Sequence, residues 1–199
     1  MEMIIVAGFL GSGKTTMVLS AIGRIIEKTG KKIVIIVNDF GTVGIDGRVM
    51  QKYGLDVMEM ASGCICCTLG ADLLATIMKL ESEVAPDIVI IEPTGVADPS
   101  AIVDAMEKYP GEPMERILST VIVDAVRFPV IYKALNRPLT SQIKGADLVL
   151  INKIDAVTPE ALKEVEITLR AINPDCPIIA TSALHGTDMD EVVAEMVGA

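Results

Sequence analysis

The segment from Gly8 to Thr15 constrains this chain more than any other. It reads G-F-L-G-S-G-K-T and therefore has the G-x-x-x-x-G-K-[ST] spacing of a phosphate-binding loop. An apolar run over residues 3–7 enters the segment like a buried strand, and residues 16–27 leave it with helical periodicity. The motif thus has the strand, loop and helix context that it requires. The alternative, a glycine-rich turn followed by Lys-Thr without any ligand, is disfavoured by these flanks.

Each residue type in this loop has a physical task. The glycines let backbone amides approach phosphate oxygens, and the helix that follows directs the positive end of its dipole at the same anion. Lys14 is expected to reach the β- and γ-phosphates, and the hydroxyl of Thr15 to ligate Mg²⁺. The sequence therefore predicts binding of a nucleoside triphosphate and Mg²⁺ by Gly8, Gly11, Gly13, Lys14 and Thr15.

The composition narrows the class of protein. The 199 residues suit one domain, and 51% are hydrophobic while only 3% are aromatic, so the core must be built from aliphatic side chains, as in a buried parallel sheet. No apolar run approaches the ~18 residues of a membrane span, and the N-terminus lacks a signal peptide. The net charge of −10 argues against non-specific binding to nucleic acid. We therefore expect a cytoplasmic protein without nucleic-acid or membrane partners.

Acidic residues follow two of the predicted strands. Residues 33–37 are β-branched or aliphatic and lead into a glycine-rich loop with Asp39 and Asp46, and residues 87–91 lead into Glu92 and Gly95. Ligands bind at the carboxyl ends of strands in such sheets, so Asp39 and Glu92 are expected to hold Mg²⁺ or to orient water. Gly95 would let the backbone approach the γ-phosphate. Solvated turns are the alternative for each of these loops.

A base-recognition signal follows the predicted strand over residues 147–151. Its N-K-x-D spacing places Asp155 to accept from guanine N1–H and N2–H₂ together, a donor pair that adenine lacks, and Lys153 to lie along the base. Asn152 is expected to brace loops. A backbone N–H near Ser182 and Ala183 could meet guanine O6. These residues favour GTP and disfavour a kinase that uses ATP, whereas a capped strand-to-helix loop is the alternative without function.

Three of the four cysteines stand close together, at Cys64, Cys66 and Cys67. Thiolates at this C-x-C-C spacing can converge on Zn²⁺ or a similar ion if the loop turns sharply. Three ligands leave one tetrahedral position for water, an Asp, His185, a second subunit or a client protein. Small buried thiols or a redox pair are the alternatives, and Cys176 is expected to be a packed thiol.

The remaining patterns complete a predicted α/β fold of the P-loop NTPase type, with a doubly wound, mostly parallel sheet of six or seven strands flanked by helices. Asp124, at the end of a predicted strand, would point to the ligand edge, although turn chemistry explains it equally well. Further strands are predicted over residues 55–60, 117–124 and 178–179. Helices are predicted over residues 69–84, over 101–107, over 126–145 with a break near Pro138, and from a start at 158–160 to 171.

These segments together resemble the CobW-like family of P-loop GTPases, which is similar to the urease and hydrogenase maturation GTPases. The match follows the chain in order over residues 8–16, 38–46, 63–67, 92–95, 98–99, 123–124 and 152–155, and it adds Ser12 and Thr16 to the expected nucleotide contacts. The C-I-C-C element is its most specific part. The resemblance implies a GTPase that binds Zn²⁺, Co²⁺ or Ni²⁺ at the cysteines and delivers it to a client metalloprotein or a cobalamin-pathway enzyme.

The resemblance also implies control of hydrolysis by client docking or by a homodimer that depends on nucleotide or metal. No arginine of the motifs is placed to assist hydrolysis, so slow turnover without a partner is expected, with Lys14, Asp39 and Glu92 as the catalytic set. Family members usually carry a smaller C-terminal domain and often a His-rich stretch, and we expect residues 1–199 to be a single GTPase domain without either. Asp39 stands where many members have Glu. A nucleotide-gated scaffold that scarcely hydrolyses GTP is the alternative function.

Overall fold

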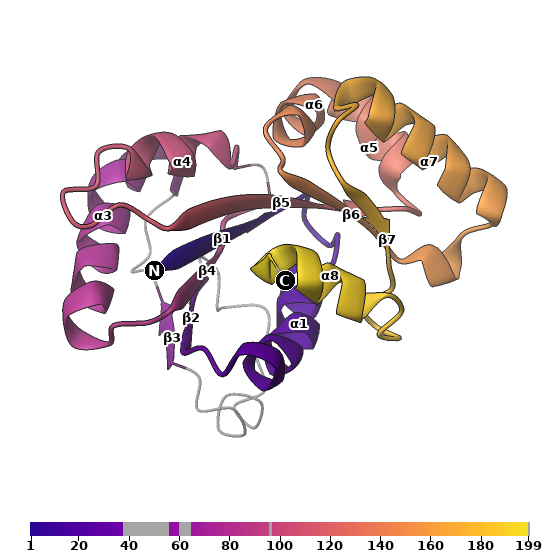
Figure 1. Cartoon of the computed structure of the whole chain (residues 1–199). Helices are drawn as coiled ribbons and strands as arrows, with labels where there is room; N and C mark the ends of the chain where they lie inside the picture. The colour runs from indigo at the N-terminus through magenta and orange to yellow at the C-terminus, as the bar shows by residue number, and fades with distance from the viewer. Residues whose placement is uncertain (38–55, 60–64, 96, 199) are drawn as a thin grey trace.

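Seven strands of the computed structural model form one sheet in the order β3-β2-β4-β1-β5-β6-β7, and every pair is parallel (Figure 1). The structure describes residues 1–37, 56–59, 65–95 and 97–198, with the side chains of 56–59 and 65–71 excepted. The sheet confirms the predicted α/β fold. Its strands are β1 (Glu2–Ala7), β2 (Ile33–Val37), β3 (Asp56–Glu59), β4 (Ile88–Glu92), β5 (Arg116–Asp124), β6 (Leu148–Asn152) and β7 (Ile178–Ala180).

The strand sequences explain why this sheet is buried on both faces. β1 and β2 are buried along their whole length, and neither shows the alternation of polar and apolar residues that a half-exposed strand requires. Successive side chains of β1 enter opposite layers: Ile4 belongs to one hydrophobic cluster, whereas Met3 and Ile5 belong to another. Continuous aliphatic runs thus supply two cores from one strand.

Helices cover both faces of the sheet (Figure 1). On one face, α1 and α8 share a core with Ile4 and Val6, and on the other face two clusters hold side chains of α3 to α7. This two-sided cover confirms the doubly wound arrangement. The helices are α1 (Lys14–Thr29), α3 (Ile65–Glu83), α4 (Ser100–Met106), α5 (Phe128–Ala134), α6 (Asn136–Lys144), α7 (Pro159–Ile172) and α8 (Met189–Val197), with a short 3₁₀ turn at Ile154–Ala156.

Three helices differ from the prediction. The break between α5 and α6 falls at Leu135, because Pro138 lies in the first turn of α6, where a missing N–H removes no helical hydrogen bond. α3 begins at Ile65, four residues before the predicted start, so the cysteine element runs into a helix. The sequence patterns did not predict α8, whose ends are fixed by left-handed residues at Asp188 and Gly198.

Parallel order brings the carboxyl ends of distant strands to one edge of the sheet. Glu92 at the end of β4 pairs with Val37 of β2, and Asp124 at the end of β5 pairs with Asn152 of β6. β1 lies between β4 and β5, so the loop after β1 is flanked by the polar ends of both neighbours. Among the residues that the structure describes, no helix is long and apolar enough to cross a membrane.

Candidate functional site

The loop between β1 and α1 has the backbone that its glycines predict. Gly8, Gly11 and Gly13 have φ angles of 138°, 75° and 97°. A Cβ at Gly13 would lie 2.4 Å from Nδ2 of Asn152, so a side chain there is excluded by both conformation and space. α1 begins directly afterwards at Lys14, and the free amides of its first turn face the loop. The segment is therefore built to bind an anion.

Lys14, Thr15 and Glu92 meet beside this loop. The Lys14 side chain is buried, and its Nζ donates to the carbonyl oxygen of Gly8 at 3.0 Å. The hydroxyl of Thr15 donates to Oε1 of Glu92 at 2.8 Å, while Oε2 of Glu92 is buried without a hydrogen-bond partner among the described atoms. Burial lowers the pKa of Lys14 and raises the pKa of Glu92, and their mutual attraction opposes both shifts. The structure thus places Lys14, Thr15 and Glu92 together, whereas Asp39 lies outside the described residues.

The loop after β4 lies directly against the phosphate-binding loop. A Cβ at Gly95 would lie 2.6 Å from the backbone nitrogen of Leu10, so only glycine permits this approach. The same loop is tied to α6: Nε2 of Gln142 donates to the carbonyl oxygen of Ala97 at 2.8 Å, and the hydroxyl of Ser141 donates to Asp98 at 2.6 Å. The loop after β4 therefore contacts the phosphate-binding loop at Gly95 and is hydrogen-bonded to α6 at Ala97 and Asp98.

Asn152 joins the phosphate-binding loop to the loop after β7. Its Nδ2 donates to the carbonyl oxygen of Ser12 at 2.9 Å, and its Oδ1 accepts from the backbone N–H of Ala183 at 3.0 Å. Asn152 is buried, and the expected bracing role agrees with this geometry. The N–H of Ala183 is engaged within the protein, so in this conformation it is not free to donate to a base.

The remaining base-site residues form a cluster around Asp155. Oδ1 of Asp155 accepts from the hydroxyl of Ser182, and Oδ2 lies 3.6 Å from Nε2 of His185. The hydrogen bond from Ser182 lowers the pKa of Asp155, with His185 and Lys153 adding in the same direction. Asp155 is therefore held as a carboxylate acceptor. The structure brings Asn152, Lys153, Asp155, Ser182 and Ala183 together as the sequence predicted.

A buried ion network also enters this region, and it was missed at the level of sequence. The carboxylate of Asp124 is 1% exposed and accepts from Nζ of Lys153 at 2.8 Å and from Nε of Arg127 at 2.9 Å. Lys153 also donates to the carbonyl oxygen of Gly11 at 2.7 Å. No local sequence pattern signals this network, because the contact between Asp124 and Lys153 depends on the pairing of β5 with β6.

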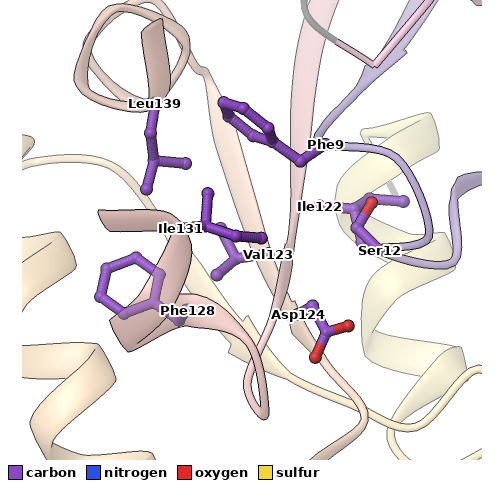
Figure 2. Close-up of a pocket in the computed structure, with 8 residues that line it drawn as sticks. All are labelled: Phe9, Ser12, Ile122, Val123, Asp124, Phe128, Ile131 and Leu139. Carbon is purple, nitrogen blue, oxygen red and sulfur yellow. The ribbon is translucent and has the colours of Figure 1, made fainter. Parts of the chain in front are cut away.

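A small pocket lies behind the phosphate-binding loop, between that loop, β5 and the α5–α6 pair (Figure 2). Its walls are mostly apolar, so they suit packing and do not suit a phosphate. The hydroxyl of Ser12 is buried in this region and has no hydrogen-bond partner among the described atoms. The pocket is lined by Phe9, Ser12, Ile122, Val123, Asp124, Phe128, Ile131 and Leu139.

Several predicted site residues lie outside the described part. Asp39 and Cys64 are not described, and of Cys66 and Cys67 only the backbone in the first turn of α3 is described. Thr16 is described and is exposed on α1. Among the described side chains, no group of three His, Cys, Asp or Glu is placed to hold a metal ion. The cysteine site therefore stays a prediction.

The sequence profile described as "CobW/HypB/UreG, nucleotide-binding domain" matches residues 2–180. The chain belongs to the CobW/HypB/UreG family. The match spans all seven strands of the sheet, so the fold and the loops described above are those of the family's nucleotide-binding domain. The resemblance predicted from the motifs is confirmed.

Known relatives of this CobW/HypB/UreG domain are similar over most of its length. The zinc chaperone YeiR of Escherichia coli is 34% identical over 158 residues, which are 79% of this chain and 48% of the relative. The crystal structure of the Zn(II)-bound YjiA GTPase from E. coli has a TM-score of 0.63 and 26% identity, covering 89% of this chain and 56% of that one. The chain spans about half the length of the curated relatives it matches.

The hydrogenase maturation factor HypB from Archaeoglobus fulgidus has the same fold. Its structure gives a TM-score of 0.66 at 22% identity and covers 98% of this chain and 88% of that one.

Proposed function

We propose that this chain binds GTP with Mg²⁺, hydrolyses it to GDP and phosphate, and couples the change to binding and delivery of a transition metal, with Zn²⁺ as the expected cargo. The observation that carries the proposal is the meeting of Lys14, Thr15 and Glu92 beside a phosphate-binding loop that Asn152 ties to the base-site cluster. Phosphate and base recognition are thus parts of one hydrogen-bonded unit. The names of the relatives, a zinc chaperone and a Zn(II)-bound GTPase, support the metal and the reaction.

In the proposed reaction, a water attacks the γ-phosphorus and the bond to the β–γ bridging oxygen breaks, which leaves GDP and inorganic phosphate. Lys14 neutralises charge on the β- and γ-phosphates together with the backbone amides of the loop. Glu92 or Asp39 orients the water. Asp155 accepts from the guanine edge, and Lys153 carries its alkyl stem along the base.

The residues beside the loop fit a magnesium ion. Thr15 offers a hydroxyl oxygen, and Glu92 offers a buried carboxylate whose Oε2 lacks a partner among the described atoms. A buried carboxylate oxygen without a partner is unfavourable unless a cation or its water completes it. Mg²⁺ bound there would neutralise the charge on the phosphate oxygens. Thr15, Glu92 and Asp39 are the proposed magnesium residues.

The proposed cargo site is the cysteine element, with Cys64, Cys66 and Cys67 as thiolate ligands. Three thiolates favour soft or borderline ions such as Zn²⁺ over Mg²⁺, and Co²⁺ and Ni²⁺ are the other candidates. The element lies in sequence between the Asp39 loop and the Glu92 loop, both of which are expected to respond to the γ-phosphate. A client metalloprotein would receive the ion. A cobalamin-pathway enzyme as client, and a homodimer, are further parts of this proposal.

Metal binding in two nucleotide states tests the coupling. The affinity for Zn²⁺ is measured with GDP and with a non-hydrolysable GTP analogue in the wild type, in Cys66→Ser and in the matched control Cys176→Ser. Cys176 is a buried thiol whose pKa is raised, first by burial, so it should be inert. We expect a nucleotide-dependent affinity in the wild type and in Cys176→Ser, and loss of the ion in Cys66→Ser. Equal affinities with both nucleotides would refute the coupling.

A nucleotide-gated scaffold without significant hydrolysis is the second candidate. In that case Glu92, whose pKa is raised, and Lys14, which donates to Gly8, would contribute to nucleotide binding and not to hydrolysis. Turnover of GTP that stays negligible with metal and client present would favour the scaffold. Preference for ATP over GTP in direct binding would instead revive a kinase.

A further inference from the structure

Asp124 is a buried carboxylate that pairs with two cationic side chains and accepts four hydrogen bonds. Its Oδ1 accepts from the backbone N–H groups of Val126 at 3.0 Å and Arg127 at 3.1 Å, and its Oδ2 accepts from the side chains of Arg127 and Lys153. Burial raises the pKa of Asp124, but the hydrogen bonds from Lys153 and Arg127 outweigh it and hold the pKa below its ordinary value. A buried carboxylate that is fully hydrogen-bonded and paired fixes the groups around it in one arrangement.

Both cations continue from Asp124 to the phosphate-binding loop. Nη2 of Arg127 donates to the carbonyl oxygen of Leu10, and Nζ of Lys153 donates to the carbonyl oxygen of Gly11. A Cβ at Gly11 would lie 2.9 Å from Nη2 of Arg127, so the glycine also makes room for the guanidinium. Two consecutive carbonyls of the loop are thus held by one anchored pair of side chains.

Holding a carbonyl also orients an amide. In a trans peptide the C=O and the following N–H point in opposite directions, so fixing the oxygen of Leu10 turns the N–H of Gly11 away from Arg127. The N–H of Ser12, in the next peptide, donates to the carbonyl oxygen of Phe9 at 3.0 Å and closes a turn. The amide of Gly11 is therefore set in direction by Arg127.

We propose that Arg127, anchored by Asp124, is a positioning residue that orients the Leu10–Gly11 peptide for GTP hydrolysis and governs turnover more than nucleotide affinity. The inference rests on the proposed GTPase function and deepens it. Arg127 touches no reacting atom in this scheme. It acts through the backbone of Leu10 and Gly11.

The position of Leu10 explains why turnover should be the sensitive quantity. Gly95 lies against the backbone nitrogen of Leu10, and the Gly95 loop is the one expected at the γ-phosphate. The first turn of α1, from Lys14, is where the phosphates of GDP should be held, and Arg127 donates to none of its atoms. A misdirected Gly11 amide should therefore affect the charge that develops during γ-phosphate transfer, and should leave GDP binding nearly unchanged.

The planar fork of arginine suits this task better than a single ammonium. Arg127 uses Nε for Asp124 and Nη2 for Leu10, so two nitrogens with a fixed spacing join the anchor to the loop. Arg127→Lys keeps the charge but loses the fork and should behave like Arg127→Gln. Arg170 is the control for loss of an arginine, because its side chain is about as exposed as that of Arg127 and is paired with a carboxylate, Glu166, on α7 away from the loop.

The experiment compares the full chain with Arg127→Gln, Arg127→Lys and the control Arg170→Gln. Four quantities are measured: kcat for GTP, the Kd for GDP, the Kd for GDP with aluminium fluoride as a transition-state mimic, and Tm. We expect both Arg127 variants to lower kcat and the affinity for the mimic about tenfold or more. The reason is that a misdirected Gly11 amide should lose part of the transition-state stabilisation that deleting such a hydrogen-bond donor would remove. The Kd for GDP should change less than about threefold. Tm should fall further than in Arg170→Gln, because Asp124 is 1% exposed and loses one of its two cationic partners, whereas Glu166 is 44% exposed.

An unchanged kcat would overturn the inference. Parallel losses of kcat and GDP affinity would also overturn it, because they would make Arg127 merely structural. A wild type that binds GTP without turning it over would refute the hydrolysis proposed above and not the positioning role. In that case the test of the positioning role is the affinity for GDP with aluminium fluoride. Equal affinities of the wild type and Arg127→Gln for this mimic would refute the role. A chain that binds no guanine nucleotide would refute both.

Discussion

Replacing Asn152 with alanine should damage stability and nucleotide binding together. The side chain is 3% exposed, and it satisfies two backbone groups on different loops, the carbonyl oxygen of Ser12 and the N–H of Ala183. Asn152→Ala leaves both groups without this partner. The two loops that it joins carry the phosphate and base sites of the proposed function.

The size of the effect follows from those two contacts. A buried backbone group left unpaired costs about 1 to 3 kcal/mol, so with two such groups Asn152→Ala should lower the free energy of unfolding by about 2 to 6 kcal/mol. For a chain of this length each kcal/mol corresponds to about 2 to 4 °C, which predicts a fall in Tm of roughly 4 to 24 °C. The Kd for GDP should rise at least about tenfold, because binding must then order loops that the side chain had fixed.

Urea unfolding and GDP titration of the same preparations measure both quantities. Asn173→Ala is the matched control: Nδ2 of Asn173 donates to the carbonyl oxygens of Ile143 at 2.9 Å and Ala146 at 3.2 Å. These residues precede β6 and β7, whereas the loops of the site follow those strands. The control should lose stability without losing affinity for GDP. The reasoning is refuted if Asn152→Ala binds GDP as tightly as the wild type, or if it is less destabilised than the control.

Three further predictions concern single residues. Because burial raises the folded-state pKa of Glu92 above its ordinary 4.5, its charged form destabilises the nucleotide-free protein at neutral pH. Glu92→Gln should therefore be the more stable protein in urea at neutral pH, and it should lose that advantage as the pH falls through the raised pKa of Glu92 toward 4.5; a pH-independent difference would contradict this. Asp155→Asn should weaken GTP binding by about 10² or more in direct titration, since the acceptor for two guanine donors is lost, whereas Asp98→Asn should leave it intact. Arg116→Ala should lower the free energy of unfolding by about 1 to 3 kcal/mol, because its guanidinium donates to two C-terminal carbonyls of α8, without changing the affinity for GDP.

The elements set by local pattern could be predicted from the sequence. β1, β2, β4 and β6 each contain at least four consecutive apolar residues because both faces of the sheet are covered, and the glycine spacing specified the loop at Gly8 to Thr15. Thr158 caps α7 as predicted, since its hydroxyl accepts from the N–H of Ala161. α8 was missed because it is short and lacks a side-chain cap, although Met189, Val192, Val193 and Met196 have helical spacing.

The network around Asp124 could not be predicted, because it depends on which strands are neighbours. Asp124 meets Lys153 only since β5 and β6 pair in a register that places Asp124 opposite Asn152, and a local pattern carries no information on strand order. Taken alone, Asp124 fits a turn equally well, and Arg127 looks like any surface cation. The roles of Asp39 and of the cysteine element remain predictions from spacing and resemblance.

The central place of β1 has a consequence for how the chain is synthesised. Glu2 pairs with Ile88 on one side and with Arg116 on the other, so β1, the first of the seven described strands to be made, waits longer than the others for its second neighbour. At about 5 to 20 residues per second, the apolar β1 waits for several seconds until β5 emerges. Parallel pairing over such separations folds slowly. The phosphate-binding loop at Gly8 to Thr15 is therefore held on both sides only once β5, which ends at Asp124, has been made.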